Sequence, residues 1–421
     1  MMNDLWTLFN YFIFLYPFYM SLLWTISGLI FFLRRERKDN PSVEDPPPFS
    51  IIIPAHNEEG NIQDTIESLS NLDYPSFEVI VVNDGSTDRT AEILDRLLVR
   101  FPDWLRVVHQ EPNSGKSRAL NTGLLVSNHE LVLVMDADCY LSDNALREMV
   151  WHFVKSPRVG AVTGNPRILN RTTLLGKIQV GEYSCIIGLI KRSQRLLGKV
   201  LTVSGVMAAY RKSALLDCGL FDADTVTEDI DITWKLQKMF WDIRYEPRAL
   251  SWILTPESIR GLARQRIRWA QGGVEVLKKH INVWKDWRYR RFWPIYIEYV
   301  ASIFWSFAFV FLLGTWAATS VLSYLDIIDF VTIQPFIPPK WTGSVLASVC
   351  LIQFIASLYI DLHYERAPLM RYYFWIIWYP LFYWIINAMA VLVGVFNVFF
   401  RRGGVTVRWK SPDRGYHTLK S

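Results

Sequence analysis

Four long stretches of this sequence contain no charged residue. They are 20 to 29 residues long and cover residues 5–33, 299–325, 341–360 and 372–400. Because about 20 apolar residues cross the hydrocarbon core of a bilayer as a helix, each stretch can form a transmembrane helix. The first is too long for the apolar part of a signal peptide and lacks a small-residue cleavage pattern. The sequence therefore predicts a chain that stays in the membrane, with a transmembrane segment at 1–33 and a transmembrane region at 295–400.

Positive charge gathers next to these stretches. Lysine and arginine residues cluster at 34–38, 288–291 and 401–402, and such clusters face the cytoplasm in membrane proteins. The net charge of +5 is therefore explained by basic residues at the membrane surface, and it does not indicate nucleic-acid binding. If 34–38 is cytoplasmic and every later stretch spans, the basic tail at 401–421 ends outside, against this rule. One stretch is therefore expected to be re-entrant or interfacial.

Between the membrane regions, strand and helix patterns alternate. A linker at 34–48 ends in three prolines, and residues 49–256 are predicted to form one cytosolic domain. Short apolar runs separated by amphipathic segments predict strands at 49–53, 77–82, 105–108 and 131–135. This alternation predicts an α/β domain, with a mostly parallel sheet flanked by helices and joined by right-handed crossovers. No G-x-G-x-x-G follows the first strand and no P-loop motif occurs, so a dinucleotide fold and a P-loop ATPase are not supported.

Three aspartates stand at the ends of predicted strands. Asp136 and Asp138 directly follow the apolar strand 131–135, and Asp84 ends the strand at 77–82. Ligands of open α/β sheets bind beyond the carboxyl ends of the strands, and Mg²⁺ takes one or two carboxylates together with phosphate oxygens. Asp136 and Asp138 are therefore a candidate nucleotide and metal site, and Asp84 is a candidate acceptor for the N3–H of a uracil ring. Turn and helix-capping roles stay open for each aspartate taken alone.

Lys116 and Gly205 are candidate ligand contacts in two predicted loops. Lys116 follows a glycine at the start of a predicted helix, where phosphate groups bind readily; a solvent-exposed lysine is the alternative. Residues 202–206 are predicted as a strand and a tight turn, in which Gly205 allows a ligand close to the backbone. Before it, a strand at 159–163 is expected to end in a turn at 165–167.

An acidic segment at 227–231 precedes a predicted helix. Thr227 is placed to cap this helix, and acidic residues suit the first turn of a helix. Three carboxylates in four positions, Glu228, Asp229 and Asp231, exceed what a cap needs. Asp229 is therefore a candidate general base beside a metal-bound diphosphate.

Two segments are predicted to lie as amphipathic helices at the membrane surface. Residues 174–197 combine an apolar face with basic residues such as Lys191 and Arg192, which is typical of an interfacial helix; packing in the core is the alternative. Residues 257–294 are rich in arginine and contain three candidate acceptor-site residues, Gln265, Arg268 and Trp269. A tryptophan offers a flat surface for a sugar ring, and the polar neighbours offer donors to phosphate or hydroxyl groups.

Four of these motifs, in this order, resemble those of processive family 2 glycosyltransferases. They are Asn83-Asp-Gly-Ser86, Asp136-Ala-Asp138, Thr227-Glu-Asp229 and Gln265-Arg-Ile-Arg-Trp269. Longer segments at 159–167, 176–183, 227–232, 245–249 and 411–415 are similar to the poly-β-1,6-N-acetylglucosamine synthase catalytic subunits of biofilm-forming bacteria. The resemblance covers nearly the whole chain and implies a glycosyltransferase-A-type domain inserted between transmembrane helices.

The resemblance also implies roles for individual residues. Asp84 and Asp136 would contact UDP, Asp138 would hold Mg²⁺ or Mn²⁺, and Asp229 would be the catalytic base. Gln265, Arg268 and Trp269 would hold the acceptor end and the diphosphate. The remaining residues assigned to substrate binding are Pro54, Asn57, Glu58, Lys116, Gly205 and Glu228. One base without a nucleophile implies a single displacement with inversion.

Partners and location follow from the same resemblance. It implies polymerisation of N-acetylglucosamine from UDP-N-acetylglucosamine, export of the growing polysaccharide, and a place in the bacterial inner membrane with the catalytic domain in the cytoplasm. It further implies a small membrane accessory subunit and stimulation by cyclic di-GMP. The alternatives are a hyaluronan, chitin or cellulose synthase, a transferase adding one sugar to a polyprenyl phosphate, and a non-catalytic transporter. Single-sugar transferases lack the Q-x-x-R-W motif present at Gln265.

Overall fold

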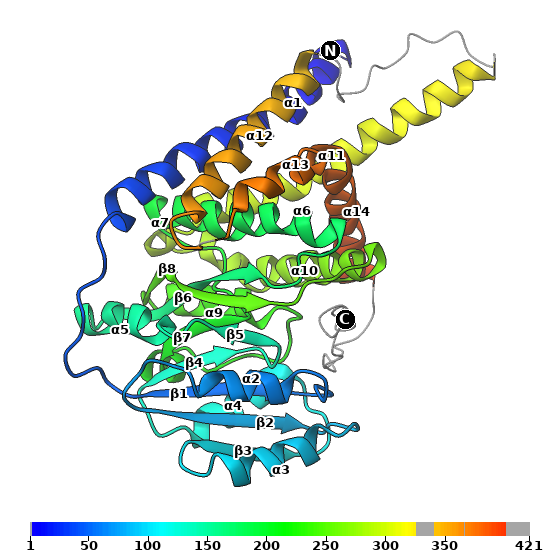
Figure 1. Cartoon of the computed structure of the whole chain (residues 1–421). Coiled ribbons are helices and arrows are strands. Elements are labelled where there is room, and N and C mark those ends of the chain that lie inside the picture. The colour runs from blue at the N-terminus through cyan, green and yellow to red at the C-terminus, as the bar shows by residue number, and fades with distance from the viewer. Residues whose placement is uncertain (1, 326–340, 366, 401–421) are drawn as a thin grey trace.

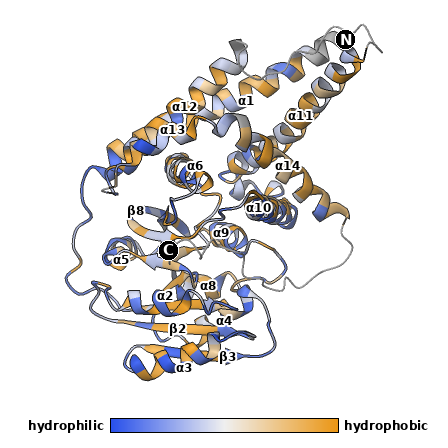
Figure 2. Cartoon of the chain, turned by 45° about the vertical axis from the view of Figure 1, so that its right-hand side comes forward, coloured by the Kyte–Doolittle hydropathy of each residue, from blue (hydrophilic) through white to orange (hydrophobic). Residues whose placement is uncertain are grey.

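The computed structural model describes residues 2–325, 341–365 and 367–400. The predicted basic tail at 401–421 lies outside this part. An α/β domain sits beneath a group of long helices, and the two are joined by a layer of further helices (Figure 1). Hydropathy follows the same division, because the long helices are mainly hydrophobic whereas the α/β domain mixes hydrophobic and hydrophilic segments (Figure 2).

The α/β domain is built on one eight-stranded sheet in the order β3-β2-β1-β4-β7-β6-β8-β5. Its strands are β1 (Phe49–Ala55), β2 (Phe77–Asp84), β3 (Leu105–Gln110), β4 (Leu131–Met135), β5 (Cys139–Leu141), β6 (Val159–Ile168), β7 (Met207–Arg211) and β8 (Asp242–Ile253). The four predicted strands, β1 to β4, are parallel neighbours as expected. The sheet as a whole is mixed, since β7 runs antiparallel to β4 and β6, and β5 runs antiparallel to β8.

Helices cover both faces of this sheet because its strands are apolar on both faces. Along β1, Ile51 and Ile53 join one core cluster, whereas Ile52 between them joins another, as the alternation of side chains in a strand requires. The first cluster is covered by α2 (Ile62–Leu69), α3 (Thr90–Arg100) and α5 (Ala145–Lys155). The second is covered by α4 (Lys116–Val126), α8 (Lys212–Asp217) and α9 (Glu228–Lys238).

Two local predictions were wrong. Residues 165–167 do not form a turn, because β6 continues through them and pairs with β8 after a register irregularity next to Asn165. Residues 202–206 contain no strand; they form a loop and a turn, and β7 begins only at Met207. In both places the pairing partner, and not the local sequence, decides where the strand lies.

The layer between sheet and long helices contains both predicted interface segments. One is α6 (Leu174–Glu182), a π-helical stretch at Tyr183–Leu189 and α7 (Ile190–Leu197), and the other is α10 (Ile259–Lys279). The basic side chains Lys191 and Arg192 were expected to face the membrane surface, but both are buried. That prediction was wrong for these two residues. They pack inside the protein, where each has a polar partner.

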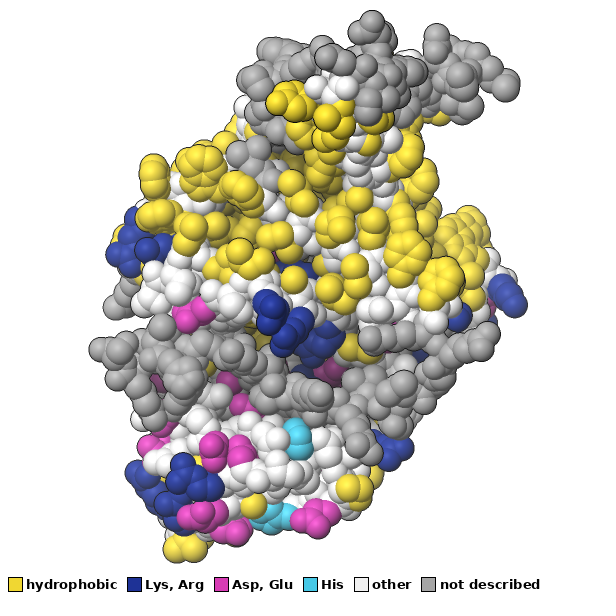
Figure 3. All heavy atoms as spheres, turned by 90° about the vertical axis from the view of Figure 1, so that its right-hand side faces the viewer, with side chains coloured by type: hydrophobic (Ala, Val, Ile, Leu, Met, Phe, Trp, Pro, Cys, Tyr) yellow, Lys and Arg dark blue, Asp and Glu magenta, His cyan; other side chains and the backbone are white. Residues whose placement is uncertain are grey.

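Four helices are long and apolar enough to cross a membrane, judged by length and composition. They are α1 (Met2–Phe31, with a π-helical end to Glu36), α11 (Trp293–Tyr324), α12 (Trp341–Asp361) and α14 (Tyr379–Phe400). Large exposed side chains such as Phe304 and Phe382 lie on them, and hydrophobic side chains cover this part of the surface (Figure 3). The four predicted apolar stretches are therefore all helices, and the chain is built as a membrane protein.

A buried ionic cluster ties two of these helices to the α/β domain. We call it the junction network; its members are Glu36, Arg167, Arg192, Asp361 and Tyr364. Arg192 Nε donates to Glu36 Oε1 at 2.8 Å, and its guanidinium lies 3.6 Å from Asp361. Asp361 also pairs with Arg167 of β6, and the Tyr364 hydroxyl donates to Glu36. The four charged side chains are at most 3% exposed, so the ends of α1 and α12 are fixed to β6 and α7.

Helix α14 packs against the layer helices at both of its ends. At its start, the Tyr379 hydroxyl lies 3.4 Å from Glu182 of α6. Near its end, Asn397 hydrogen-bonds Gln271 of α10 at 3.4 Å, and Gly394 lets the two backbones approach closely. In Figure 1, α14 descends to the level of α10, whereas α11 extends away from the α/β domain. This placement supports the prediction that one stretch is re-entrant or interfacial.

Candidate active site

The loops that follow β1 and β2 are joined to each other. Pro54 is buried near the end of β1. Asn57 takes a left-handed φ of 55°, and its side-chain oxygen accepts from Thr87 N at 2.8 Å. Glu58 N donates to Thr90 Oγ1 at 2.9 Å. The first loop is thus held against the start of α3, at the carboxyl edge of the parallel strands where ligands bind.

Asp84 organises the loop that leads into α4. Its side chain is fully buried and accepts three hydrogen bonds, each 2.8 Å long, from Gln110 Nε2, Ser114 N and Gly115 N. Two of these donors lie just before the first turn of α4, where backbone N–H groups lack helical partners. The described role of Asp84 is therefore to shape the loop that carries Lys116; its contact with uracil stays a prediction.

Lys116 brings three predicted site residues together. Its ammonium lies 2.8 Å from Asp136 Oδ1 and 2.8 Å from Glu228 Oε1, and it donates to Gly205 O at 3.4 Å. Burial lowers the pKa of Lys116, but the Asp136 and Glu228 carboxylates outweigh this and raise the pKa above its ordinary value. The residues come from four separate segments, so these contacts show that the fold brings them together; their roles in substrate binding stay predictions.

Asp138 is the candidate metal ligand. Its side chain is 4% exposed and lies between β4 and β5, two residues after Asp136. Hard cations such as Mg²⁺ and Mn²⁺ prefer carboxylate and phosphate oxygens. The cationic group of Lys116 already rests between Asp136 and Glu228, so this region attracts positive charge. A buried carboxylate in this setting fits the chemistry of a divalent cation, and the assignment of Asp138 as its ligand stays a prediction.

Asp229, the candidate base, is in the first turn of α9. Its Oδ1 accepts from Ile230 N at 3.0 Å, and a Cβ at Gly205 would lie 3.0 Å from its Oδ2. The glycine therefore allows the 205–206 turn to pack closely on this carboxylate, which a larger residue would displace slightly. Burial first, and the Glu228 carboxylate second, raise the pKa of Asp229 to about 6, although Lys116 and Arg268 oppose the shift. A carboxylate of this kind is ionised at neutral pH and more basic than an exposed one.

Helix α10 packs directly against the start of α9. A Cβ at Gly272 would collide with the Thr227 side chain, and Glu275 Oε2 accepts from Val226 N at 2.9 Å. Thr227 occupies the N-cap position of α9, as predicted, but its side chain makes no capping hydrogen bond. Its side chain instead fills the contact with Gly272, and this contact places the Q-x-x-R-W helix beside Asp229.

The three predicted acceptor-site residues lie on α10, one to two turns before Gly272. Gln265 is half-buried, Arg268 is exposed and Trp269 is half-buried. The Arg266 guanidinium lies 4.2 Å from the centre of the Trp269 ring, and Arg266 in turn pairs with Glu182 at 2.6 Å. Trp269 is therefore held in place by a neighbouring cation on the ring. Its contact with a sugar stays a prediction.

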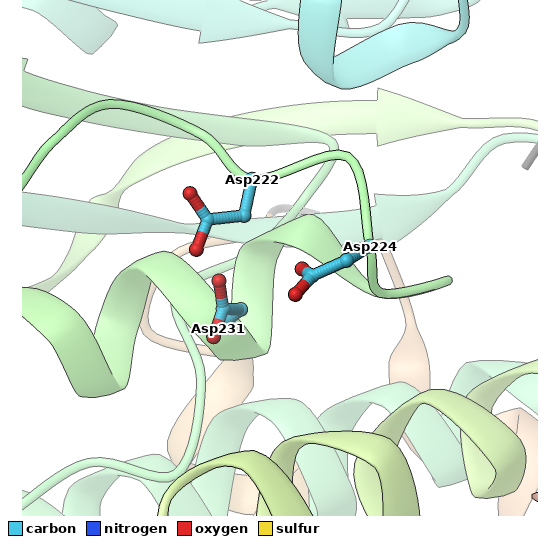
Figure 4. Close-up of side chains that lie close together, drawn as sticks. All are labelled: Asp222, Asp224 and Asp231. Carbon is cyan, nitrogen blue, oxygen red and sulfur yellow. The ribbon is translucent and has the colours of Figure 1, made fainter. Parts of the chain in front are cut away.

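A second acidic cluster lies close to Asp229. Asp222, Asp224 and Asp231 have carboxylate oxygens within 4.8 Å of one another, as Figure 4 shows. However, the Lys279 ammonium contacts all three, at 2.5, 2.8 and 3.0 Å, and His280 lies 2.7 Å from Asp231. A lysine thus takes the place that a cation would occupy. We assign this cluster to fixing α9 on the end of α10, and Asp138 stays the predicted metal ligand.

Residues 46–272, more than half of the chain, match the model of the family described as "Glycosyltransferase like family 2". This region contains every candidate site residue described above.

The chain belongs to family 2 of the glycosyltransferases.

Relatives in this family match nearly the whole chain. A poly-β-1,6-N-acetyl-D-glucosamine synthase of Staphylococcus epidermidis is 39% identical and covers 97% of this chain and 98% of its own length. A synthase of the same name from Staphylococcus aureus is also 39% identical, with the same coverage. Among solved structures, a mannosyltransferase from Pyrobaculum calidifontis, in complex with GDP-Man and Mn²⁺, has a TM-score of 0.65, 20% identity, and coverage of 95% and 99%. That structure confirms the predicted glycosyltransferase-A-type fold.

The sequence did not predict that the buried Lys191 of α7 lies beside the candidate site. Its ammonium donates to Thr163 Oγ1 at 3.0 Å, and the same oxygen accepts from Ser204 N at 2.8 Å. Lys191 therefore supports, through Thr163, the turn that packs on Asp229. In the described part of the chain it forms no ion pair, and burial lowers its pKa to about 7 against the opposing influence of Asp229.

Replacing Lys191 by methionine should make the enzyme more sensitive to acid. Below about pH 7 the lysine is charged, so its loss removes a cation near Asp229 and raises the pKa of the base further. The other charged groups that face Asp229 are Glu228, Lys116 and Arg268, and these stay. We expect kcat/KM to fall several-fold at pH 6 and to change little at pH 8.

The matched control is Lys199→Met, which removes a largely buried lysine whose charge faces Asp242 and not Asp229. Identical pH profiles for Lys191→Met and wild type would show that Lys191 does not act on the base.

Proposed function

We propose that this chain is a membrane-embedded processive β-glycosyltransferase that polymerises N-acetylglucosamine from UDP-N-acetylglucosamine into poly-β-1,6-N-acetylglucosamine. The observation that carries the proposal is 39% identity to synthases of that name over 97% of this chain and 98% of the relatives. The four membrane-type helices attached to the catalytic domain support it, because a polymer made for the cell surface must cross the membrane.

In the proposed reaction, Asp229 accepts the proton of an acceptor hydroxyl while the hydroxyl oxygen attacks C1 of the donor sugar and UDP leaves. One displacement inverts C1, so an α-linked donor gives a β-linked product. The raised pKa of Asp229 suits this role, because a more basic carboxylate takes a proton more readily. Lys116 and Arg268 would bind the diphosphate.

Asp138 would hold the metal ion, Mg²⁺ or Mn²⁺, which would offset the negative charge of the departing diphosphate. We expect Asp138→Ala to raise the metal concentration needed for half-maximal activity by at least about tenfold, since it removes a ligand from a cation with few protein ligands. Titration of the metal against UDP release measures this change. Asp103→Ala, at an exposed position, is the matched control, and equal titration curves for the two variants would contradict the assignment.

The proposal includes the setting of the enzyme. The catalytic domain would face the cytoplasm at the bacterial inner membrane, and the polymer would be exported for a biofilm matrix. A small membrane subunit would assist, and cyclic di-GMP would stimulate synthesis. The basic residues at Arg34–Lys38, beside the catalytic domain, support the cytoplasmic placement.

The proposal is tested with purified membranes and a panel of sugar nucleotides. We expect UDP release and polymer formation with UDP-N-acetylglucosamine, and digestion of the product by a β-1,6-specific glycosidase. Polymer made only from UDP-glucose, or with UDP-glucuronic acid as a required second donor, would identify a different synthase. A single sugar transferred to a polyprenyl phosphate would overturn the polymerase proposal.

A further inference from the structure

A basic cavity lies where α1 meets the α/β domain, away from the catalytic carboxylates. Its volume is about 570 Å³. It is bordered by the end of α1 and the following linker, the end of α5, the end of α7 and the middle of β8. In Figure 1 this place lies between the lower end of α1 and α5. None of the residues assigned to sugar transfer lines it.

The cavity lining carries excess positive charge. Seven lining side chains are lysine or arginine, and three are carboxylates. Two of the carboxylates are already engaged: Glu36 binds Arg192 in the junction network, and Glu246 binds His152 and Arg248. The third, Asp39, is 98% exposed. Glu246 and Asp39 both pair with the lining Arg248, at 3.4 and 3.6 Å, whereas Glu36 pairs with Arg192. The three lining carboxylates therefore pair with only one of the seven lining lysine and arginine side chains.

Several of the cations remain available to a ligand. In the described part of the chain, Arg34, Arg35 and Lys38 form no ion pair with a carboxylate. Arg195 and Arg244 share a single carboxylate, Asp242, at 3.1 and 2.6 Å. Burial, together with the charges of Arg244 and Arg35, lowers the pKa of Arg195 despite its pair with Asp242. Like charges thus crowd together here, and an anion would relieve their repulsion.

The cavity also touches the apolar surface of a membrane helix. Phe31, the last residue of α1, lines it together with Arg34 and Arg35, and α1 belongs to the candidate span at Thr7–Glu36. Leu196, at the end of α7, lines it and is 37% exposed. The charged end of a span lies at the level of the lipid headgroups. The cavity therefore combines a basic pocket at headgroup level with an apolar flank toward the acyl chains.

We propose that this cavity binds the phosphate headgroup of an anionic phospholipid from the leaflet on the catalytic side. Arginine guanidinium groups match phosphate oxygens with paired hydrogen bonds, and the apolar flank at Phe31 and Leu196 accommodates the start of an acyl chain. A free phosphate ester shares the headgroup chemistry but lacks the chain. An experiment is therefore needed to distinguish binding of the phospholipid from binding of a free phosphate ester.

The test uses the full-length protein, purified in neutral detergent and exposed to phosphatidylglycerol, phosphatidylcholine, inorganic phosphate or glycerol 1-phosphate. Native mass spectrometry counts retained lipid, and thermal denaturation reports stabilisation. We expect phosphatidylglycerol alone to be retained and to raise the melting temperature. Equal stabilisation by inorganic phosphate or glycerol 1-phosphate would show that the ligand is a soluble anion and not a lipid. Equal retention of phosphatidylglycerol and phosphatidylcholine would overturn the proposal.

Two double variants make the test specific to the cavity. Arg35→Gln with Lys38→Gln removes two unpaired charges from the lining, and we expect it to weaken phosphatidylglycerol retention by about tenfold or more, the scale of one strong charge-assisted contact. Arg290→Gln with Arg291→Gln removes two exposed charges near the start of α11, outside the cavity. An equal loss in both double variants would mean that general attraction to anionic lipid, and not this cavity, holds the headgroup.

Discussion

Replacing Asp229 by asparagine should lower kcat/KM for sugar transfer by about 10²–10⁴-fold, the range that a general base contributes. The amide keeps the shape of the side chain and its hydrogen bond from Ile230 N through the amide oxygen, but it cannot take up the proton of the acceptor. UDP binding should change little, because the predicted nucleotide contacts lie in other segments. UDP release and calorimetric UDP binding, measured on one preparation, give the two values.

Asp224→Asn is the matched control for this variant. Asp224 precedes α9 and its side chain is 64% exposed, so its contact with Lys279 contributes at most about 1 kcal/mol to stability. Activity near that of wild type is expected. If Asp229→Asn lost UDP binding and activity together, Asp229 would hold the site in shape, and the base would have to be another residue.

Replacing Arg192 by methionine should strongly destabilise the folded protein. The side chain is completely buried and binds Glu36 and lies beside Asp361. Removing one partner of a buried ionic cluster leaves the other charges without compensation and costs about 3–5 kcal/mol. The purified variant should therefore denature at a clearly lower temperature than wild type, by several degrees or more.

A second variant distinguishes lost pairing from lost packing. Arg192→Met together with Glu36→Gln removes the arginine and its main partner charge, so part of the lost stability should return. Arg100→Met, which breaks a surface pair with Glu67, should change the melting temperature very little. Equal destabilisation in the single and double variants would show that the shape of Arg192, and not its charge, matters.

The first half of the sheet could be predicted from the sequence because its signals are local. Strands β1, β2 and β4 are apolar runs buried on both faces, and such runs differ clearly from the polar loops around them. The continuation of β6 through Pro166 could not be predicted. There, polar residues are stabilised by partners far away in the sequence, such as Asp361 for Arg167. The neighbouring sequence does not indicate that pairing.

The candidate site was predicted in part for a similar reason. Asp136 directly follows a strand and Glu228 begins a helix, and both positions are visible in the sequence. Their Lys116 contacts show that the fold brings these two motifs together. Gly272 and Lys191 were missed, because a glycine and a lysine in a helix carry no catalytic signal. Their importance comes from what tertiary packing places next to them, which is Thr227 for Gly272 and Thr163, the partner of Ser204 N, for Lys191.

The placement of α14 decides how many times the chain crosses the bilayer. Helices α1 and α12 end at the junction network, and α11 starts against the layer helix α10, where the Tyr296 hydroxyl donates to Leu277 O. Each of the three can therefore cross once. Both ends of α14 contact layer helices on the side of the α/β domain. If α14 stays on this face of the bilayer, the chain crosses it three times, and the start of α1 and the end of α14 lie on opposite faces. Arg34, just after α1, would then share a face with the end of α14, on the side that positive charge favours.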